Sequence, residues 1–107
     1  MNFSELGLQK ALLTAARDQG YEHATPIQRR AIPEILRGKD ILAGAQTGTG
    51  KTAAFALPLL QQLSVLHEVS EEEKLLVLVI TPTRELAAQV RTSFCDYGKN
   101  LPFRSAA

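Results

Sequence analysis

Apolar residues recur with the spacing of amphipathic helices in two outer parts of the chain. Between residues 8 and 19 they recur at i, i+3, i+4, i+7 and i+8, which predicts a helix packed on a core. Gly20 is a natural stop for it. A final helix is predicted over residues 84–97, ended by Gly98. The residues that we expect to face inward are, in the first helix, Leu8, Ala11, Leu12, Ala15 and Ala16, and in the last, Leu86, Ala87, Val90, Phe94 and Tyr97.

Two further helices are predicted, each with a proline inside it. One begins at Thr25-Pro26, a cap followed by proline in the first turn, and ends before Gly38. Pro33 predicts a kink in this helix, or its division into two short pieces. The other covers residues 51–63 and is apolar on most faces, so we expect it to be central, with a bend at Pro58.

Two short apolar runs indicate buried strands. Residues 40–45 form one, and residues 75–80, six consecutive apolar positions, form the other. Unbroken runs of this kind are typical of parallel strands that are covered on both faces. The acidic stretch 64–74 between them is expected to be a surface loop. The predicted order is therefore helix-helix-strand-helix-strand-helix, with a right-handed crossover between the strands.

This order is that of an α/β protein at the start of a doubly wound, parallel sheet. Two strands make a poor sheet, since typical sheets have about 4–6. We therefore expect the 107 residues to be the N-terminal part of a longer protein. Partner strands from a second chain, or domain swapping, are the alternatives, and exposed sheet edges would then favour a dimer.

Composition and charge exclude several classes. The formal net charge is +1, so nucleic acid would have to be bound by local groups rather than by a global basic field. The single cysteine, Cys95, excludes an internal disulfide and fits a reducing compartment. No apolar run approaches the roughly 20 residues that span a bilayer, and the N-terminus lacks the order of a signal peptide. We expect a cytoplasmic protein with no membrane partner.

Residues 45–52 connect the first predicted strand to the apolar helix and carry a phosphate-binding pattern. They fit G-x-x-x-x-G-K-[ST] except that alanine replaces the leading glycine. Gly48 and Gly50 allow backbone N–H groups to point toward one phosphate. Lys51 adds a positive charge and Thr52 a hydroxyl for Mg²⁺. The predicted phosphate loop thus consists of Ala45, Gln46, Thr47, Gly48, Thr49, Gly50, Lys51 and Thr52.

Gln28 lies upstream and is suited to reading a base. Its carboxamide could donate to N7 and accept from the N6 amine of adenine. Phe3 or Tyr21 could supply an aromatic face for the ring. The residues alone equally allow a structural role, because Thr25 and Gln28 have the spacing of a capping box. In that case Phe3 would be a core residue and His23 an ordinary loop residue.

Three blocks of the sequence together resemble the DEAD-box RNA helicases. Phe3, followed by residues 20–28, is similar to the family's Q motif. Residues 45–52 resemble motif I, in which alanine is the usual first residue. Residues 82–89 (PTRELAAQ) resemble motif Ia. The blocks occur in the family's order over most of the chain, and their phrasing is most similar to the bacterial RhlE-type members.

The resemblance implies a partial RecA-like fold and a set of ligands. Residues 1–107 would be the N-terminal part of the first RecA-like helicase domain, with a Q-motif region at 1–29 and an incomplete phosphate-loop core at 40–107. Gln28 would contact adenine, with Phe3, Tyr21 and His23 around the base. ATP and Mg²⁺ would be the cofactors, with Lys51 catalytic and Thr52 the metal ligand. RNA would be the partner, and the residues that would contact it are Pro82, Thr83, Arg84 and Gln89.

From the residues alone, motif Ia also has a plain structural interpretation. Thr83 would cap the last helix, Glu85 would complement its dipole and Arg84 would be solvated. The chain also lacks the family's Asp-Glu-Ala-Asp and Ser-Ala-Thr blocks. We therefore expect this fragment not to hydrolyse ATP. Because the predicted sheet beneath the phosphate loop is incomplete, we also expect it to bind adenine nucleotide weakly. The alternatives are another phosphate-loop ATPase or kinase, and a non-catalytic nucleotide-binding or dimerising module.

Overall fold

The computed structural model describes residues 2–44, 50–69 and 76–107, and its regular elements are helical. A short 3₁₀ turn, η1 (Phe3–Glu5), precedes α1 (Lys10–Asp18) and α2 (Pro26–Leu36). Next come α3 (Lys51–Val69) and α4 (Arg84–Tyr97). The helices predicted near the two ends of the chain are thus confirmed, and α4 has the predicted bounds.

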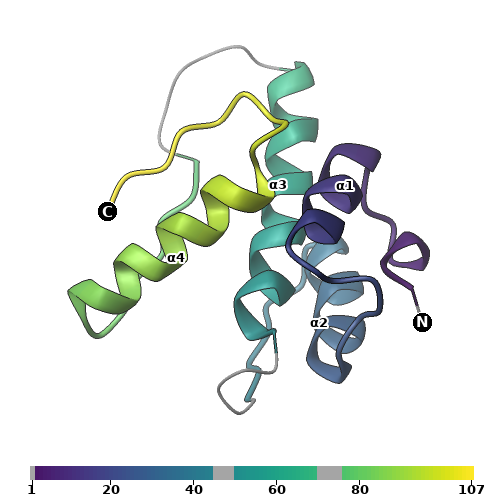
Figure 1. The fold of residues 1–107 in the computed structure, drawn as a ribbon, viewed down its shortest axis with the longest axis horizontal. Coiled ribbons are helices and arrows are strands. Elements are labelled where there is room, and N and C mark those ends of the chain that lie inside the picture. The colour runs from purple at the N-terminus through teal and green to yellow at the C-terminus, as the bar shows by residue number, and fades with distance from the viewer. Residues whose placement is uncertain (1, 45–49, 70–75) are drawn as a thin grey trace.

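The helix α3 is the centre of the molecule. In Figure 1 it runs vertically, with α1 and α2 to its right and α4 to its left, and it contacts all three. Its most extensive packing is against α2. Leu57 and Ile32, one from each helix, are fully buried in the common core. The predicted central place of this apolar helix is therefore confirmed. The other fully or nearly fully buried members of the core include Leu12, Ala16, Ala53, Ala56 and Leu60.

Both proline-containing helices are continuous, so the predicted division of α2 at Pro33 is wrong. Proline costs α2 one backbone hydrogen bond and crowds the carbonyl one turn earlier. Ala31 and Ile32, directly before Pro33, are buried, and their packing outweighs that cost. The helix α3 likewise passes through Pro58.

The predicted surface loop is wrong over residues 64–69, where α3 continues to Val69. Six residues without glycine or proline follow Leu63, which is itself buried. Adding a residue to an existing helix costs far less than starting one, so the helix propagates past its buried stripe. The remaining residues of the predicted loop, 70–74, lie outside the described part of the chain.

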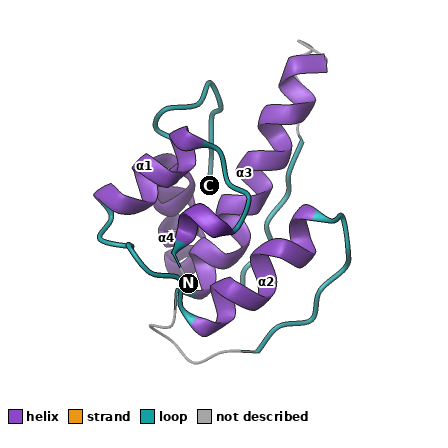
Figure 2. Ribbon diagram, turned by 90° about the vertical axis from the view of Figure 1, so that its right-hand side faces the viewer, coloured by secondary structure: helices purple, strands orange, loops and turns teal. Residues whose placement is uncertain are grey.

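The two predicted strands are not formed in the part of the chain that the structure describes. Residues 40–44 and 76–80 are drawn as loops in Figure 2, and the single β-bridge among described residues joins Asn2 and His23. Leu42, Leu78 and Ile80 are largely exposed. A strand needs a hydrogen-bonded neighbour. These segments instead border a common groove, so the apolar pattern alone did not determine pairing.

Four predicted inward positions are less buried than expected. Leu86 of α4 is 39% exposed. Ala11 of α1 and Ala87 and Phe94 of α4 are only half-buried. Leu86 borders the same groove as residues of the segments 40–44 and 76–80. Val90 and Tyr97, further along α4, are buried as predicted.

Candidate nucleotide-binding site

Gly50 lies at the junction where the chain enters α3. Its φ is +81°, a conformation that favours glycine because a side chain is strained there. Its carbonyl accepts the first hydrogen bond of the helix, from the Ala54 N–H, at 3.1 Å. A Cβ at this position would lie 2.2 Å from Gln28 Nε2. Any other residue at this position would therefore strain the backbone and would also displace the Gln28 carboxamide.

Gln28 is the one fully buried polar residue in the described part of the chain, and both ends of its carboxamide are bonded to backbone. Oε1 accepts from the Thr25 N–H at 2.9 Å, which is the capping-box contact that the sequence left open. Nε2 donates to the Gly50 carbonyl at 3.1 Å. This second bond was not foreseen, because the residues are far apart in sequence. The predicted contact with adenine stays a prediction, and it requires the carboxamide to become accessible.

Lys51 and Thr52 form the first turn of α3. Lys51 is exposed and Thr52 is half-buried. Both lie at the rim of a groove of about 440 Å³. Apolar residues such as Ile41, Phe55 and Val79 line most of the groove, so its interior does not suit phosphate. The N-terminus of α3 does suit phosphate, because backbone N–H groups are available there. The other predicted loop residues, Ala45, Gln46, Thr47, Gly48 and Thr49, lie outside the described residues.

The three predicted base-pocket residues are brought together at the N-terminal end. The bridge between Asn2 and His23 holds η1 beside the segment before α2. The Phe3 and Tyr21 rings meet edge to face with centroids 6.1 Å apart. Phe3 is only 4% exposed and belongs to the core, Tyr21 is half-buried and His23 is exposed. Of the two roles left open for Phe3, packing in the core is therefore the one the structure contains.

Tyr97 at the end of α4 extends this aromatic group. Its ring centroid is 6.4 Å from that of Tyr21. Burial raises the pKa of the Tyr97 phenol above its ordinary value, and the neighbouring Tyr21 adds to the effect. The sequence placed Tyr97 on the inward face of its helix but contained no signal for this partner, because the contact joins opposite ends of the chain.

The predicted RNA-binding residues lie at the N-terminus of α4. Thr83 caps the helix, with its Oγ1 accepting from the Leu86 N–H at 3.1 Å. The structural role expected of Thr83 is thus confirmed. Pro82, Arg84 and Gln89 are exposed, and Arg84 forms no ion pair with any described residue. Pro82 also borders the groove, so the first turns of α3 and α4 open onto the same side of the molecule.

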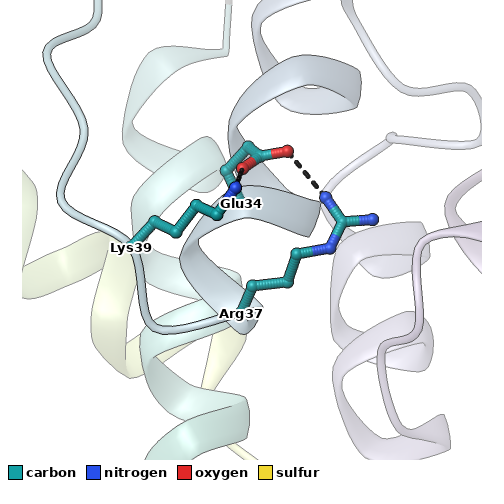
Figure 3. A network of polar contacts seen from close by, with 3 residues as sticks. All are labelled: Glu34, Arg37 and Lys39. Carbon is teal, nitrogen blue, oxygen red and sulfur yellow. Dashed lines mark hydrogen bonds and ion pairs between the residues drawn. The ribbon is translucent and has the colours of Figure 1, made fainter.

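The far end of α2 carries a small surface network. Glu34 pairs with Arg37 through Oε1 at 2.6 Å and with Lys39 through Oε2 at 3.3 Å (Figure 3). All three side chains are substantially exposed, so each pair contributes no more than about 1 kcal/mol. Near the same end, Gln62 Nε2 of α3 donates to the Ile35 carbonyl at 2.7 Å. Two glutamine side chains thus link α2 to the α3 region: Gln28 near the start of α2 and Gln62 near its end.

The described residues contain no group of three or more His, Cys, Asp or Glu side chains placed to hold a metal ion. None of the described helices combines the length and apolar character needed to cross a membrane.

Comparison with known proteins identifies the family. Residues 25–107 match the family model described as DEAD/DEAH box helicase, so the chain belongs to this family. It is 48% identical over 104 residues to the ATP-dependent RNA helicase CshA of Limosilactobacillus reuteri, covering 97% of this chain and 20% of that protein. It is 48% identical over 99 residues to the ATP-dependent RNA helicase DeaD of Escherichia coli K12, covering 92% of this chain and 15% of that protein.

Solved structures agree with this assignment. The chain superposes on the RNA helicase Prp28 of Chaetomium thermophilum, solved with ADP bound, with a TM-score of 0.85 and 39% identity. That match covers 98% of this chain and 26% of the other. A DEAD box protein from Methanococcus jannaschii matches with a TM-score of 0.79 and 42% identity, over 91% of this chain and 25% of the other. The chain therefore spans only 15% to 26% of the length of these four proteins.

Proposed function

We propose that this chain is the ATP-binding part of the first RecA-like domain of an ATP-dependent RNA helicase. The observation that carries the proposal is the junction at α3. There Gly50, Lys51 and Thr52 complete a phosphate-loop sequence at the N-terminus of a long helix, and Gly50 is held by Gln28. The longer protein would couple ATP binding and hydrolysis to the unwinding or remodelling of RNA duplexes. The relatives' names and the family match support this activity.

The residues of the chain fit a nucleotide with Mg²⁺. The first N–H groups of α3 and the Lys51 ammonium would hold the phosphates, together with residues 45–49. The Thr52 hydroxyl would be one ligand of Mg²⁺, which supplies charge neutralisation on the phosphates when bound. Phe3, Tyr21, His23 and Gln28 would lie on the side of the base. Pro82, Thr83, Arg84 and Gln89 would contact RNA phosphates at the start of α4.

We propose that the 107-residue chain alone does not hydrolyse ATP. Hydrolysis needs a carboxylate that holds Mg²⁺ and a group that orients the attacking water. The chain has three aspartates. Asp18, the last residue of α1, forms an ion pair with Lys99. Asp40 follows α2, and Asp96 lies near the end of α4. None of them follows an apolar segment after the phosphate loop.

Titration with a fluorescent ATP analogue and Mg²⁺ tests the binding proposal. Lys51→Ala should weaken binding at least about tenfold, because it removes the positive charge on the phosphates. Lys10→Ala is the matched control, since Lys10 is the first residue of α1 as Lys51 is of α3. Equal affinities of the two variants would disprove the phosphate-site assignment. RNA-stimulated phosphate release by the unmodified chain would disprove its expected inactivity.

One observation favours self-association of this chain as a second property. Leu42, Leu78 and Ile80 expose apolar side chains on two segments whose backbones form no ladder in the described part of the molecule. Such edges pair readily with another chain. Sedimentation should show a dimer that Leu78→Lys and Ile80→Lys together convert to monomer. A monomer before substitution would exclude the dimer.

We also propose that the protein is cytoplasmic. The single cysteine, Cys95, is exposed and free, which is consistent with a reducing compartment.

A further inference from the structure

The carboxamide of Gln61, in the middle of α3, bonds to the backbone on both sides of Leu8. Its Oε1 accepts from the Gln9 N–H at 2.9 Å, and its Nε2 donates to the Gly7 carbonyl at 3.4 Å. These two groups belong to the connector between η1 and α1 (residues 6–9), and they lie 52 and 54 positions away in the sequence. A side chain of the central helix therefore holds the N-terminal segment at two neighbouring points of its backbone.

The connector has little local chemistry that would fix its position. Gln9 is the N-cap of α1, but its side chain forms no capping bond, and glutamine is not a favoured residue at this position. Its backbone N–H precedes the helix and so has no partner within it. Leu6 and Leu8 are buried, but apolar burial is not directional, whereas hydrogen bonds are. The contacts with Gln61 therefore specify where the connector lies along α3.

The connector leads directly to the aromatic pair on the proposed base side. The turn η1 ends at Glu5, and Phe3 within it meets Tyr21 edge to face with ring centroids 6.1 Å apart. Phe3 shares one buried core with Leu60, the residue before Gln61. Close packing of this kind transmits displacement, so a shift of the connector moves the aromatic pair.

The same helix carries the proposed phosphate side of the site. Lys51 is the first residue of α3, and Gln61 follows ten residues later, which is about 15 Å along the helix axis. Because both residues belong to one continuous helix, Gln61 relates the position of the aromatic pair to that of the phosphate-binding turn. A ligand that spans both sides binds well only where this spacing is held closely.

We propose that Gln61 is a positioning residue for the base side of the nucleotide site. It acts through the connector and the Phe3–Tyr21 pair, so it supports binding of the nucleoside part of the ligand rather than of the phosphates. The inference rests on the proposed nucleotide-binding function, and it adds to the site a residue that lies outside the three blocks of family resemblance.

The test is the affinity of variants for ATP and for inorganic tripolyphosphate, each with Mg²⁺. Gln61→Met keeps the length of the side chain and removes both hydrogen bonds. We expect it to weaken ATP about fivefold and to change tripolyphosphate less than about twofold. Gln62→Met is the matched control, because Gln62 is the next residue of α3 but its Nε2 donates to the Ile35 carbonyl of α2. It should change both affinities less than about twofold.

Two results with Gln61→Met would overturn the positioning role. Equal weakening of both ligands would show that Gln61 only stabilises the fold, because a loosened fold affects the phosphates as well as the base. An unchanged affinity for ATP would show that the connector does not matter to the site. If the unmodified chain binds neither ligand, the proposed function fails, and the positioning role fails with it.

Hydrogen exchange keeps the proposal testable should circular dichroism show that Gln61→Met is unfolded. In the unmodified chain the Gln9 N–H should exchange at least about tenfold more slowly than in an unfolded chain, because Gln61 Oε1 accepts its hydrogen bond. Exchange at the unfolded rate would overturn the proposal. Among folded variants, exchange of Gln9 should accelerate severalfold in Gln61→Met and stay unchanged in Gln62→Met, and equal rates in the two would contradict the proposal.

Discussion

The helices and the segments 40–44 and 76–80 of this chain are both rich in apolar residues, yet the helices bury far more of them. Leu57 in α3 is fully buried, whereas Leu78 in the segment 76–80 is 74% exposed. A helix satisfies its backbone hydrogen bonds within itself and needs only a surface to pack on. A strand needs neighbouring strands for its backbone as well. Local pattern is thus sufficient for the first kind of element and insufficient for the second.

The largest effect that sharpens this comparison is expected in the helical core. Leu57→Ala should lower the free energy of unfolding by about 2–5 kcal/mol, because it removes buried methyl groups and leaves a cavity. Leu78→Ala is the same substitution in the extended segment and should change it by less than about 0.5 kcal/mol. Urea unfolding followed by circular dichroism measures both values. Similar losses would mean that the segment 76–80 is packed in solution and that the contrast is wrong.

A smaller effect is expected at two glycines that flank helices. Gly50 precedes α3 with φ +81°, and Gly38 follows α2 with φ +79°. A Cβ at Gly38 meets nothing within 4 Å, whereas one at Gly50 meets Gln28. Gly38→Ala should therefore cost only backbone strain, about 1–2 kcal/mol, and Gly50→Ala about 1–3 kcal/mol more, since it also breaks the Gln28 contact.

The two glycine variants are compared by the same unfolding measurement. A Gly50→Ala variant no less stable than Gly38→Ala would show that Gln28 moves away at no cost. The contact between Gln28 and Gly50 would then contribute nothing measurable to the stability of the start of α3.

The smallest effect belongs to the surface network at the end of α2. Glu34→Gln removes the charge that pairs with Arg37 and Lys39, yet should lower the free energy of unfolding by no more than about 1 kcal/mol. The difference should shrink further in high salt, because exposed pairs are screened. Thermal unfolding at low and high salt measures it. A loss that is larger and independent of salt would show that this network, rather than apolar packing, holds the end of α2 before residues 40–44.

The extent of the helices shows where sequence reasoning succeeds. Helix α4 was predicted with its observed bounds because Thr83 and Gly98 mark its ends with local chemistry. The division of α2 at Pro33 and the end of α3 near residue 63 were wrong. For α2 the outcome depended on packing, because Ala31 and Ile32 directly before Pro33 are buried. For α3 it depended on helix propagation, because the helix continues to Val69 beyond Leu63, its last buried leucine.

The candidate site divides in the same way. The phosphate-loop pattern ending at Thr52 and the cap at Thr83 could be predicted, since each is a run of adjacent residues. The double role of the Gln28 carboxamide could not be predicted, because its second partner lies 22 positions along the chain. The Tyr21–Tyr97 contact was missed for the same reason.

By itself, then, the sequence determined which segments are helical, which residues cap them and which family the chain resembles, because these depend on residues a few positions apart. Only the tertiary structure decided that Gln28 holds Gly50, that Phe3 enters the core and that the apolar segments border a groove without forming a ladder in the described residues. These outcomes depend on which parts of the chain, distant in sequence, meet in the fold. The neighbouring element then supplies the hydrogen-bond partner and limits the room for each side chain.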